Sequence, residues 1–383
     1  DPTQSAGRPY RGGMRLGWER SPSGWRWLGL GAAVTVLVVL PGLVAAVPAS
    51  DRAVTAGELL GRVLASDRVA YQGYAEARAG LALPDVPRAG RVVALLGETT
   101  RMRAFVAGPN LWRVDELTPI GERDLYRDDG GTLLWDSGER RAEATGGEPP
   151  VRFARPADLL PPELGRRVAA AAEAGEATRL GARRVAGVQA LGLRIVPRPA
   201  GTTVGRVDLW ADPGSGLPVR VELTARGGTA PILTATFLDL RLGAPDPGHV
   251  RFTVPDDADV ESDEAPDLAR AIDRFSPYVL PDLLAGRPRR TSVSSAASTY
   301  GRGFELVAVL AFPASFSPRT RDFLEKVPIR RGPWGEASVL ATPLLNGMVF
   351  EHDGVAYALA GTVTQPALDR VAAQLAHDGV GLR

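Results

Sequence analysis

Acidic side chains are the residues of this sequence whose density first suggests chemistry. Glycoside hydrolysis needs two carboxylates at a set separation, so an anchored hydrolase that uses a carboxylate pair is one alternative function. Charges of this kind more often cover the exposed face of a sheet, and nothing in the sequence indicates a raised pKa. We therefore expect solvated surface charge at the seven acids between positions 115 and 136, which are Asp115, Glu116, Glu122, Asp124, Asp128, Asp129 and Asp136.

Other catalytic and metal-binding patterns are missing from the sequence. There is no cysteine, which excludes thiolate nucleophiles, Cys-ligated zinc and disulfides. The three histidines, His249, His352 and His377, are dispersed, and no H-E-x-x-H or G-x-x-x-x-G-K-[ST] motif occurs. Ser215 lies between two glycines in a turn-rich string and lacks the G-x-S-x-G context of a serine nucleophile. We predict no enzyme activity, no catalytic residue, no metal and no cofactor.

The overall charge does not indicate a nucleic-acid partner. The chain has 45 Lys and Arg residues against 44 Asp and Glu residues, for a net charge of +1. A protein that binds nucleic acid would show a basic excess on one domain or one face.

A long apolar segment predicts contact with a membrane. Residues 27–47 contain no charge, and roughly 20 apolar residues are enough to cross a bilayer. Arginines dominate the preceding residues 1–26, which predicts a basic tail that stays in the cytoplasm while the bulk of the chain is outside. Small residues near Ala49 would suit cleavage, so 27–49 is either a transmembrane anchor or a signal peptide, and we favour a retained anchor. The predicted location is the cell membrane, single-pass, or secretion after cleavage.

The exported part alternates between helical and strand patterns. Residues 51–70 predict a helix in which Thr55 caps and Glu58 completes a capping box. Short apolar runs separated by Gly and Pro predict antiparallel strands over 69–136 and again after about 177. Residues 156–176 predict a helix opened by Pro161 and Pro162. The clearest hairpin is 207–224, turned by the string from Asp212 to Gly216.

Apolar side chains of the predicted sheet and helix indicate either an ordinary core or a cavity that binds an acyl chain. A buried acyl chain gains roughly 0.8 kcal/mol per CH₂. The candidate cavity residues are Leu95, Phe105, Trp112, Trp135, Leu209, Val221, Leu223 and Phe237. The candidate lid residues, from the helix expected over 158–174, are Leu159, Leu160, Leu164 and Val168.

Composition also predicts a domain division. We expect a lipid-binding domain over 52–260 and a linker over 261–299, because 256–266 is acidic and 286–299 is polar. Residues 300–383 then form a small α+β domain that closes with a helix near Thr364 and Gln365.

Five segments between 55 and 260 resemble a known superfamily. They read LLGRVLASDRVAYQGYAEA, GETTRMRAFVAGPNLWRVDEL, GERDLYRDDGGTLLWDSG, VDLWADPGSGLPVRVEL and TFLDLRLGAPDPGHVRFTVPDDADV. In this order they are similar to the LolA lipoprotein carriers and the RseB (MucB) sigma-E regulatory proteins, and the chain is identified as a membrane-anchored member of actinobacterial type. The resemblance implies an α+β fold with an unclosed antiparallel β-barrel and a helical lid, beside the small C-terminal α+β domain and the N-terminal transmembrane helix.

The resemblance also implies a binding function. An RseB-like protein would bind or sense a lipid or lipoprotein through its acyl chain and regulate an envelope partner such as an anti-sigma factor. The alternative within the superfamily is a lipoprotein carrier of the LolA type. The expected anchor and the additional residues 300–383 favour the regulator, because a carrier should be free of the membrane and lacks this region.

Overall fold

The computed structural model describes residues 54–83, 90–119, 121–146, 154–253, 255, 258–264, 268–292, 294–316 and 327–382. None of the helices in these ranges combines the length and the apolar character that crossing a membrane requires. The predicted basic tail 1–26 and the predicted anchor or signal 27–49 lie outside the described residues.

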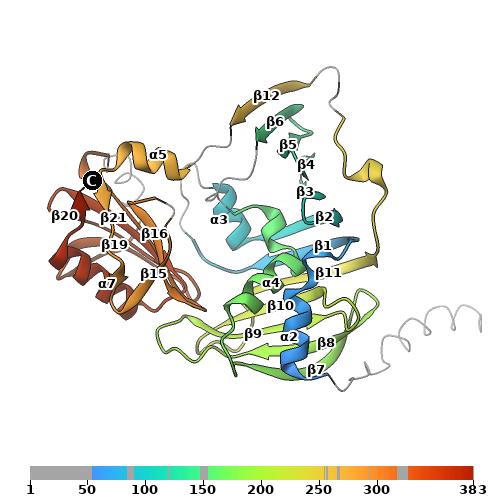
Figure 1. The fold of residues 1–383 in the computed structure, drawn as a ribbon, viewed down its shortest axis with the longest axis horizontal. Coiled ribbons are helices and arrows are strands. Elements are labelled where there is room, and N and C mark those ends of the chain that lie inside the picture. Colours follow the sequence, from blue (N-terminus) through green and yellow to red (C-terminus); the bar gives the residue numbers. More distant parts are fainter. Residues whose placement is uncertain are drawn as a thin grey trace, which may run out of the picture. The chain divides into compact units, whose positions relative to one another are not determined.

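One large open sheet dominates the first part of the chain (Figure 1). Its twelve strands follow the order β12-β6-β5-β4-β3-β2-β1-β11-β10-β9-β8-β7, so β12 and β7 are unpaired edges and the sheet does not close. Neighbours pair antiparallel except β12 and β6, which are parallel. The strands are β1 (Tyr71–Ala79), β2 (Thr99–Gly108), β3 (Leu111–Thr118), β4 (Gly121–Asp128), β5 (Gly131–Asp136), β6 (Arg141–Gly146), β7 (Ala177–Val185), β8 (Val188–Ile195), β9 (Val204–Ala211), β10 (Pro218–Ala225), β11 (Leu233–Leu242) and β12 (Asp259–Glu264).

Two helices cover part of this sheet. In α2 (Ala56–Leu64), Thr55 and Glu58 form the predicted capping box. The helix α4 (Pro161–Ala171) has Pro161 at its first position, where its missing N–H costs nothing. Leu59 and Val63 of α2 pack in one apolar cluster with α4 and with β8–β10, and Figure 1 shows both helices crossing these strands.

The predicted lid helix is shorter than expected. Leu159 ends the 3₁₀ helix η2 (Pro156–Leu159) and Leu160 joins it to α4. Asp158 is the third residue of η2, and its carboxylate accepts from the N–H of Arg155, the N-cap residue. The remaining short elements of this part are the 3₁₀ helices η1 (Ser66–Arg68) and η3 (Pro247–His249), and the helix α3 (Gly90–Gly97).

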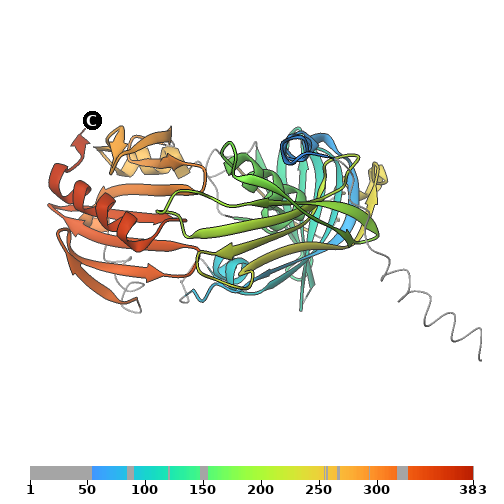
Figure 2. The ribbon, with the colours of Figure 1, turned by 90° about the horizontal axis from the view of Figure 1, so that it is seen from below.

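A second sheet of eight strands forms the C-terminal part. Its order is β14-β15-β16-β17-β21-β20-β19-β18, and α7 (Gln365–Asp378), with Thr364 at its N-cap as predicted, lies along one face (Figure 2). Leu368, Val371 and Leu375 of α7 are fully buried. The strands are β14 (Leu283–Leu284), β15 (Arg287–Ser292), β16 (Ala297–Arg302), β17 (Glu305–Pro313), β18 (Ile329–Gly332), β19 (Gly335–Ala341), β20 (Asn346–His352) and β21 (Val355–Gly361).

The C-terminal part begins earlier than the boundary predicted at 300. The expected linker 261–299 contains the helix α5 (Leu268–Phe275), the strands β14 and β15, and the strand β13 (Tyr278–Val279), which pairs with β22 (Gly381–Leu382). The arginine content of this segment is typical of a solvated linker. In the fold Arg287 pairs with Glu305, and the backbone of β15 pairs with β16.

The segment 201–203 ties the large sheet to the C-terminal sheet. The hydroxyl of Thr202 contacts the carbonyls of Phe304 and Thr362 at 2.8 and 2.9 Å. The hydroxyl of Thr203 donates to the carbonyl of Leu344 at 2.5 Å. Phe304 and Leu344 also enter the apolar cluster that contains α2 and α4. The two sheets therefore share buried apolar contacts.

Candidate functional site

A groove of about 340 Å³ lies where β1–β3 meet η2 and α4, and we call it the α4 groove. Tyr71, Val106 and Trp112 form its floor, because they are cross-strand neighbours on β1, β2 and β3. Ala157 and Leu160 contribute from the η2 and α4 side. Alternation along each strand sends these side chains to one face of the sheet, which leaves an apolar floor facing the lid.

Charged residues at the groove are present in equal numbers of each sign and are largely paired. The lining includes three arginines and three acids: Asp67, Arg155, Asp158, Glu163, Arg166 and Arg167. Arg167 pairs with Asp158 at 2.6 Å, and Arg166 pairs with Glu163. A ligand would therefore meet polar groups that already neutralise one another.

The hydroxyl of Tyr71 is the exception to this pairing. Tyr71 is 3% exposed, and its ring packs edge-on against Phe237 at 5.6 Å. Burial raises the pKa of Tyr71, the negative charge of Glu163 raises it further and Arg166 lowers it. Tyr71 lines the groove, and none of the hydrogen bonds found among the described residues involves its hydroxyl.

The structure brings only some of the predicted cavity and lid residues to the groove. Trp112 and Leu160 line it, and Phe237 supports Tyr71. Most of the other predicted residues belong to the packed core instead; these are Leu95, Leu159, Leu164, Val168, Leu209, Val221 and Leu223.

Phe105 and Trp135 lie on the opposite face of the sheet. Phe105 precedes Val106 on β2, and strand alternation therefore turns it away from the groove. Its ring contacts His249 at 4.8 Å, and Trp135 contacts Phe252 at 5.5 Å. The segment after β11 therefore covers this outer face. Without the strand register, the sequence does not show which residues belong to which face of the sheet.

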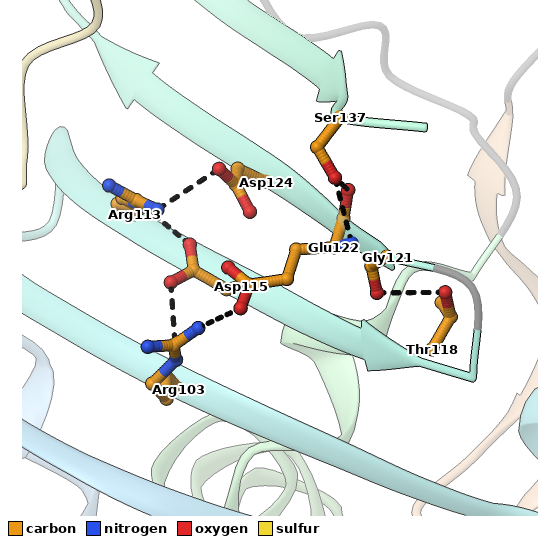
Figure 3. Close-up of polar contacts among 8 residues, drawn as sticks. All are labelled: Arg103, Arg113, Asp115, Thr118, Gly121, Glu122, Asp124 and Ser137. Carbon is orange, nitrogen blue, oxygen red and sulfur yellow. Dashed lines mark hydrogen bonds and ion pairs between the residues drawn. The ribbon is translucent and has the colours of Figure 1, made fainter. Parts of the chain in front are cut away.

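The acids that first suggested chemistry form a compact cluster on the same outer face (Figure 3). Asp115 of β3 lies directly opposite Asp124 of β4. The two residues are only 1% and 6% exposed, so the expectation of solvated surface charge is wrong for both. The hairpin that joins β3 to β4 fixes the register that pairs them, and this register was not evident from the sequence.

Two arginines hold the carboxylates in place. Arg113 donates to both Asp115 and Asp124, the latter at 3.0 Å, and its guanidinium lies 5.0 Å from the ring centre of Tyr126. Arg103 pairs with Asp115 at 3.7 Å and with Glu122. Figure 3 shows the resulting chain of contacts across β2, β3 and β4.

Burial changes the protonation of this pair. Loss of solvation raises the pKa of Asp124 to about 7, the neighbouring charge of Asp115 raises it further, and Arg113 opposes the rise. Burial likewise raises the pKa of Asp115, against the hydrogen bond and charge of Arg113. Two close carboxylates cannot both ionise easily, so Asp115 and Asp124 share one proton near neutral pH.

The cluster does not have the surroundings of a catalytic or metal site. Oxygens of Asp115, Glu122 and Asp124 lie within 4.8 Å of one another, a spacing that a cation could bridge. Arg103 and Arg113 already supply the positive charge there. Among the described residues, neither Asp115 nor Asp124 lines the α4 groove, the cavity beside Phe252 or the cavity beside Glu122. The geometry is that of an ion-paired structural network.

Comparisons with known proteins give structural likeness alone. No family model matches the chain, and no curated protein matches it. Two solved structures of MucB are similar to this chain, each with a TM-score of 0.48 and 18% identity. One is MucB in complex with MucA(peri), and the match covers 83% of this chain and 97% of that one. The other is the MucA/MucB complex of Pseudomonas aeruginosa, and the match covers 83% of this chain and 96% of that one. A LolA superfamily protein from Nitrosomonas europaea is similar over 52% of this chain and 99% of its own, at 12% identity and TM-score 0.21.

Proposed function

We propose that this chain is an RseB-like binding protein of the cell envelope, and not an enzyme, and that it holds an acyl chain of a lipid or lipoprotein in the α4 groove. The observation that carries the proposal is the groove itself, an apolar floor of Tyr71, Val106 and Trp112 beneath a lid formed by η2 and α4. Concave sites lined by apolar side chains and a few polar groups are the usual form of small-molecule sites, and here six charged side chains surround the apolar floor.

The size of the groove sets the scale of the affinity. A volume of about 340 Å³ is near the lower end of typical ligand pockets, so it suits part of an acyl chain. Burying about eight methylenes would contribute roughly 6 kcal/mol. Before the cost of ordering the ligand, that figure corresponds to a dissociation constant between roughly millimolar and micromolar. Binding of this strength is reversible, as a sensor or a carrier requires.

Location and partner are part of the proposal. The arginine-rich residues before position 27 and the uncharged run 27–47 support a single-pass anchor with the groove outside the cytoplasmic membrane. The resemblance of the sequence to RseB supports an envelope partner such as an anti-sigma factor. A lipoprotein carrier of the LolA type is the alternative, and it would require a chain that leaves the membrane.

Photolabelling of the full chain tests the proposal. The protein is placed in phosphatidylcholine vesicles and titrated with an acyl probe that carries a diazirine near the end of its chain, and labelled peptides are identified by mass spectrometry. We expect saturable labelling of β2 and β3 at the groove. Competition by an unlabelled amphiphile should remove it. Labelling that stays linear with probe concentration would show that the groove does not bind acyl chains.

A pair of valine variants provides the control. Val106→Asp places an unpaired charge on the groove floor, where it is costly, and labelling should fall at least tenfold. Val196→Asp changes a valine that is 46% exposed and outside the groove, and labelling should be unchanged. Equal loss in both variants would indicate a general defect in folding.

A further inference from the structure

The second half of β11 has an edge that no described strand occupies. β10 pairs with β11 only between Leu233 and Thr236, whereas β1 pairs with the other side of β11 as far as Leu242. The N–H of Gly243 donates to β1, and backbone groups alternate between the two sides of a strand. Those of Leu240 and Leu242 therefore point to the free side. Unpaired edge groups of this kind are a template for pairing with another chain.

The side chains along this edge are accessible, and its charges lack partners. Leu238 and Leu242 are 53% and 46% exposed, and Asp239 and Arg241 are exposed as well. None of the ion pairs or hydrogen bonds found among the described residues involves the side chain of Asp239 or Arg241. The edge thus presents apolar groups and one charge of each sign to whatever pairs with it.

The sequence of the edge is complementary to itself. Residues 238–242 read Leu-Asp-Leu-Arg-Leu. When two copies pair antiparallel about Leu240, Asp239 of each copy lies opposite Arg241 of the other, and the outer leucines lie opposite one another. Opposite charges directly across a ladder stabilise it, and like charges destabilise it. Pairing centred on Asp239 or on Arg241 would place a like charge opposite itself, so the order of charges specifies the register centred on Leu240.

We propose that two copies of this chain associate through the free edge of β11, as an antiparallel pair centred on Leu240. A two-fold contact uses the same patch on both copies and closes at two subunits, so the assembly stops at a dimer. The matched order of charges favours a second copy over an unrelated strand, which has no reason to repeat it. A five-residue contact is smaller than a standard stable interface, so we expect the dimer to form reversibly.

Disulfide cross-linking of the full chain in phosphatidylcholine vesicles tests the contact. The chain has no cysteine, so Leu240→Cys introduces a single thiol. In the dimer this thiol lies opposite its own copy, at a separation that a disulfide can bridge. Under mild oxidation, Leu240→Cys should give roughly fivefold or more linked dimer than Val196→Cys. Val196 is an exposed residue outside β11 and reports random collisions. Equal yields for the two variants would overturn the proposal.

Charge reversal in the Leu240→Cys chain tests the register. Asp239→Arg places two arginines opposite each other and Arg241→Asp places two acids opposite each other, so each should lower the yield roughly fivefold. A mixture of the two variants again sets every positive charge opposite a negative one, and the yield should return to within about twofold of the parent. Misfolded chains would not recover on mixing. Unchanged yields in the single variants, or no recovery in the mixture, would overturn the proposed pairing. Linkage in membranes of the native host only to proteins of other masses would show that a different strand occupies the edge, which would also overturn it.

Discussion

Replacing Asp124 by Asn should change how the stability of this protein depends on pH. Asp124 is buried against Asp115 and accepts a hydrogen bond from Arg113. An Asn side chain has the same shape as a protonated Asp. Its amide oxygen can still accept from Arg113, and its amide nitrogen can donate to Asp115. The substitution therefore keeps the contacts and removes only the titration.

The magnitude follows from the two pKa values of this carboxyl. Its pKa is about 7 in the folded chain, against 3.8 for the free group. Between these values the folded chain binds a proton that the unfolded chain has released, so the free energy of unfolding falls as the pH rises. At 1.36 kcal/mol per pH unit, the total loss is up to roughly 4 kcal/mol, complete near pH 7. Below about pH 4 this carboxyl contributes no difference.

Urea denaturation followed by circular dichroism between about pH 4 and pH 8 measures this effect. Asp124→Asn should match the wild type near pH 4 and exceed it by up to roughly 4 kcal/mol at pH 8. Asp129→Asn, on the exposed turn between β4 and β5, is the control and should show no such divergence. A constant difference between Asp124→Asn and wild type across the range would refute the argument that the buried pair shares a proton.

Two further predictions concern packing. Gly165→Ala on α4 should destabilise the protein by about 1–2 kcal/mol and lower its melting temperature, because a Cβ there would lie 2.5 Å from a proline ring on β10. Gly61→Ala on α2 is the control: its Cβ would meet nothing within 4 Å, so it should stabilise the protein by up to about 1 kcal/mol. Phe304→Ala should lower the free energy of unfolding by about 3 kcal/mol, because Phe304 is only 7% exposed. Phe275 is 56% exposed, so Phe275→Ala should lower it far less. Equal melting temperatures for the two variants would show that the sheets do not share a core.

Local features of the fold could be predicted because their signals are short in sequence. The capping box of Thr55 and Glu58 is present in α2. The turn between β9 and β10 is held by the carboxylate of Asp212, which accepts from the N–H groups of Gly214 and Ser215. Each of these depends on residues within three positions of one another, so no knowledge of the distant chain is needed.

The composition of the candidate sites could not be predicted, because it depends on strand register. A shift of one residue moves every side chain of a strand to the other face. Phe105 and Val106 are equally apolar neighbours, yet only Val106 reaches the groove. Asp115 meets Asp124 because of the register between β3 and β4, and no spacing rule in the sequence specifies that register.

Polar composition also misled the assignment of the segment before position 300. Long arginine side chains can extend beyond the edge of a sheet and form hydrogen bonds there, while their backbone pairs normally within the sheet. The guanidinium of Arg289 donates to the carbonyl of Leu280, and Tyr300, its partner across the strands, is fully buried. A strand rich in arginine therefore resembles a linker in composition and behaves as part of the sheet.

The two faces of β1–β3 impose different mechanical constraints on the α4 groove. Beneath the floor, the buried carboxylate of Asp115 pairs with Arg103 and Arg113, and breaking these contacts would leave its charge unpaired in the interior, at a cost of several kcal/mol. On the other side, η2 and the first turn of α4 contribute apolar contacts and two ion pairs, one between Arg167 and the buried Asp158 and one between Arg166 and Glu163. Gly165 lets α4 approach Pro218 of β10 closely. We expect a ligand that needs more room than the groove offers to move η2 and leave the sheet in place, because the floor is held by continuous cross-strand pairing of β1, β2 and β3.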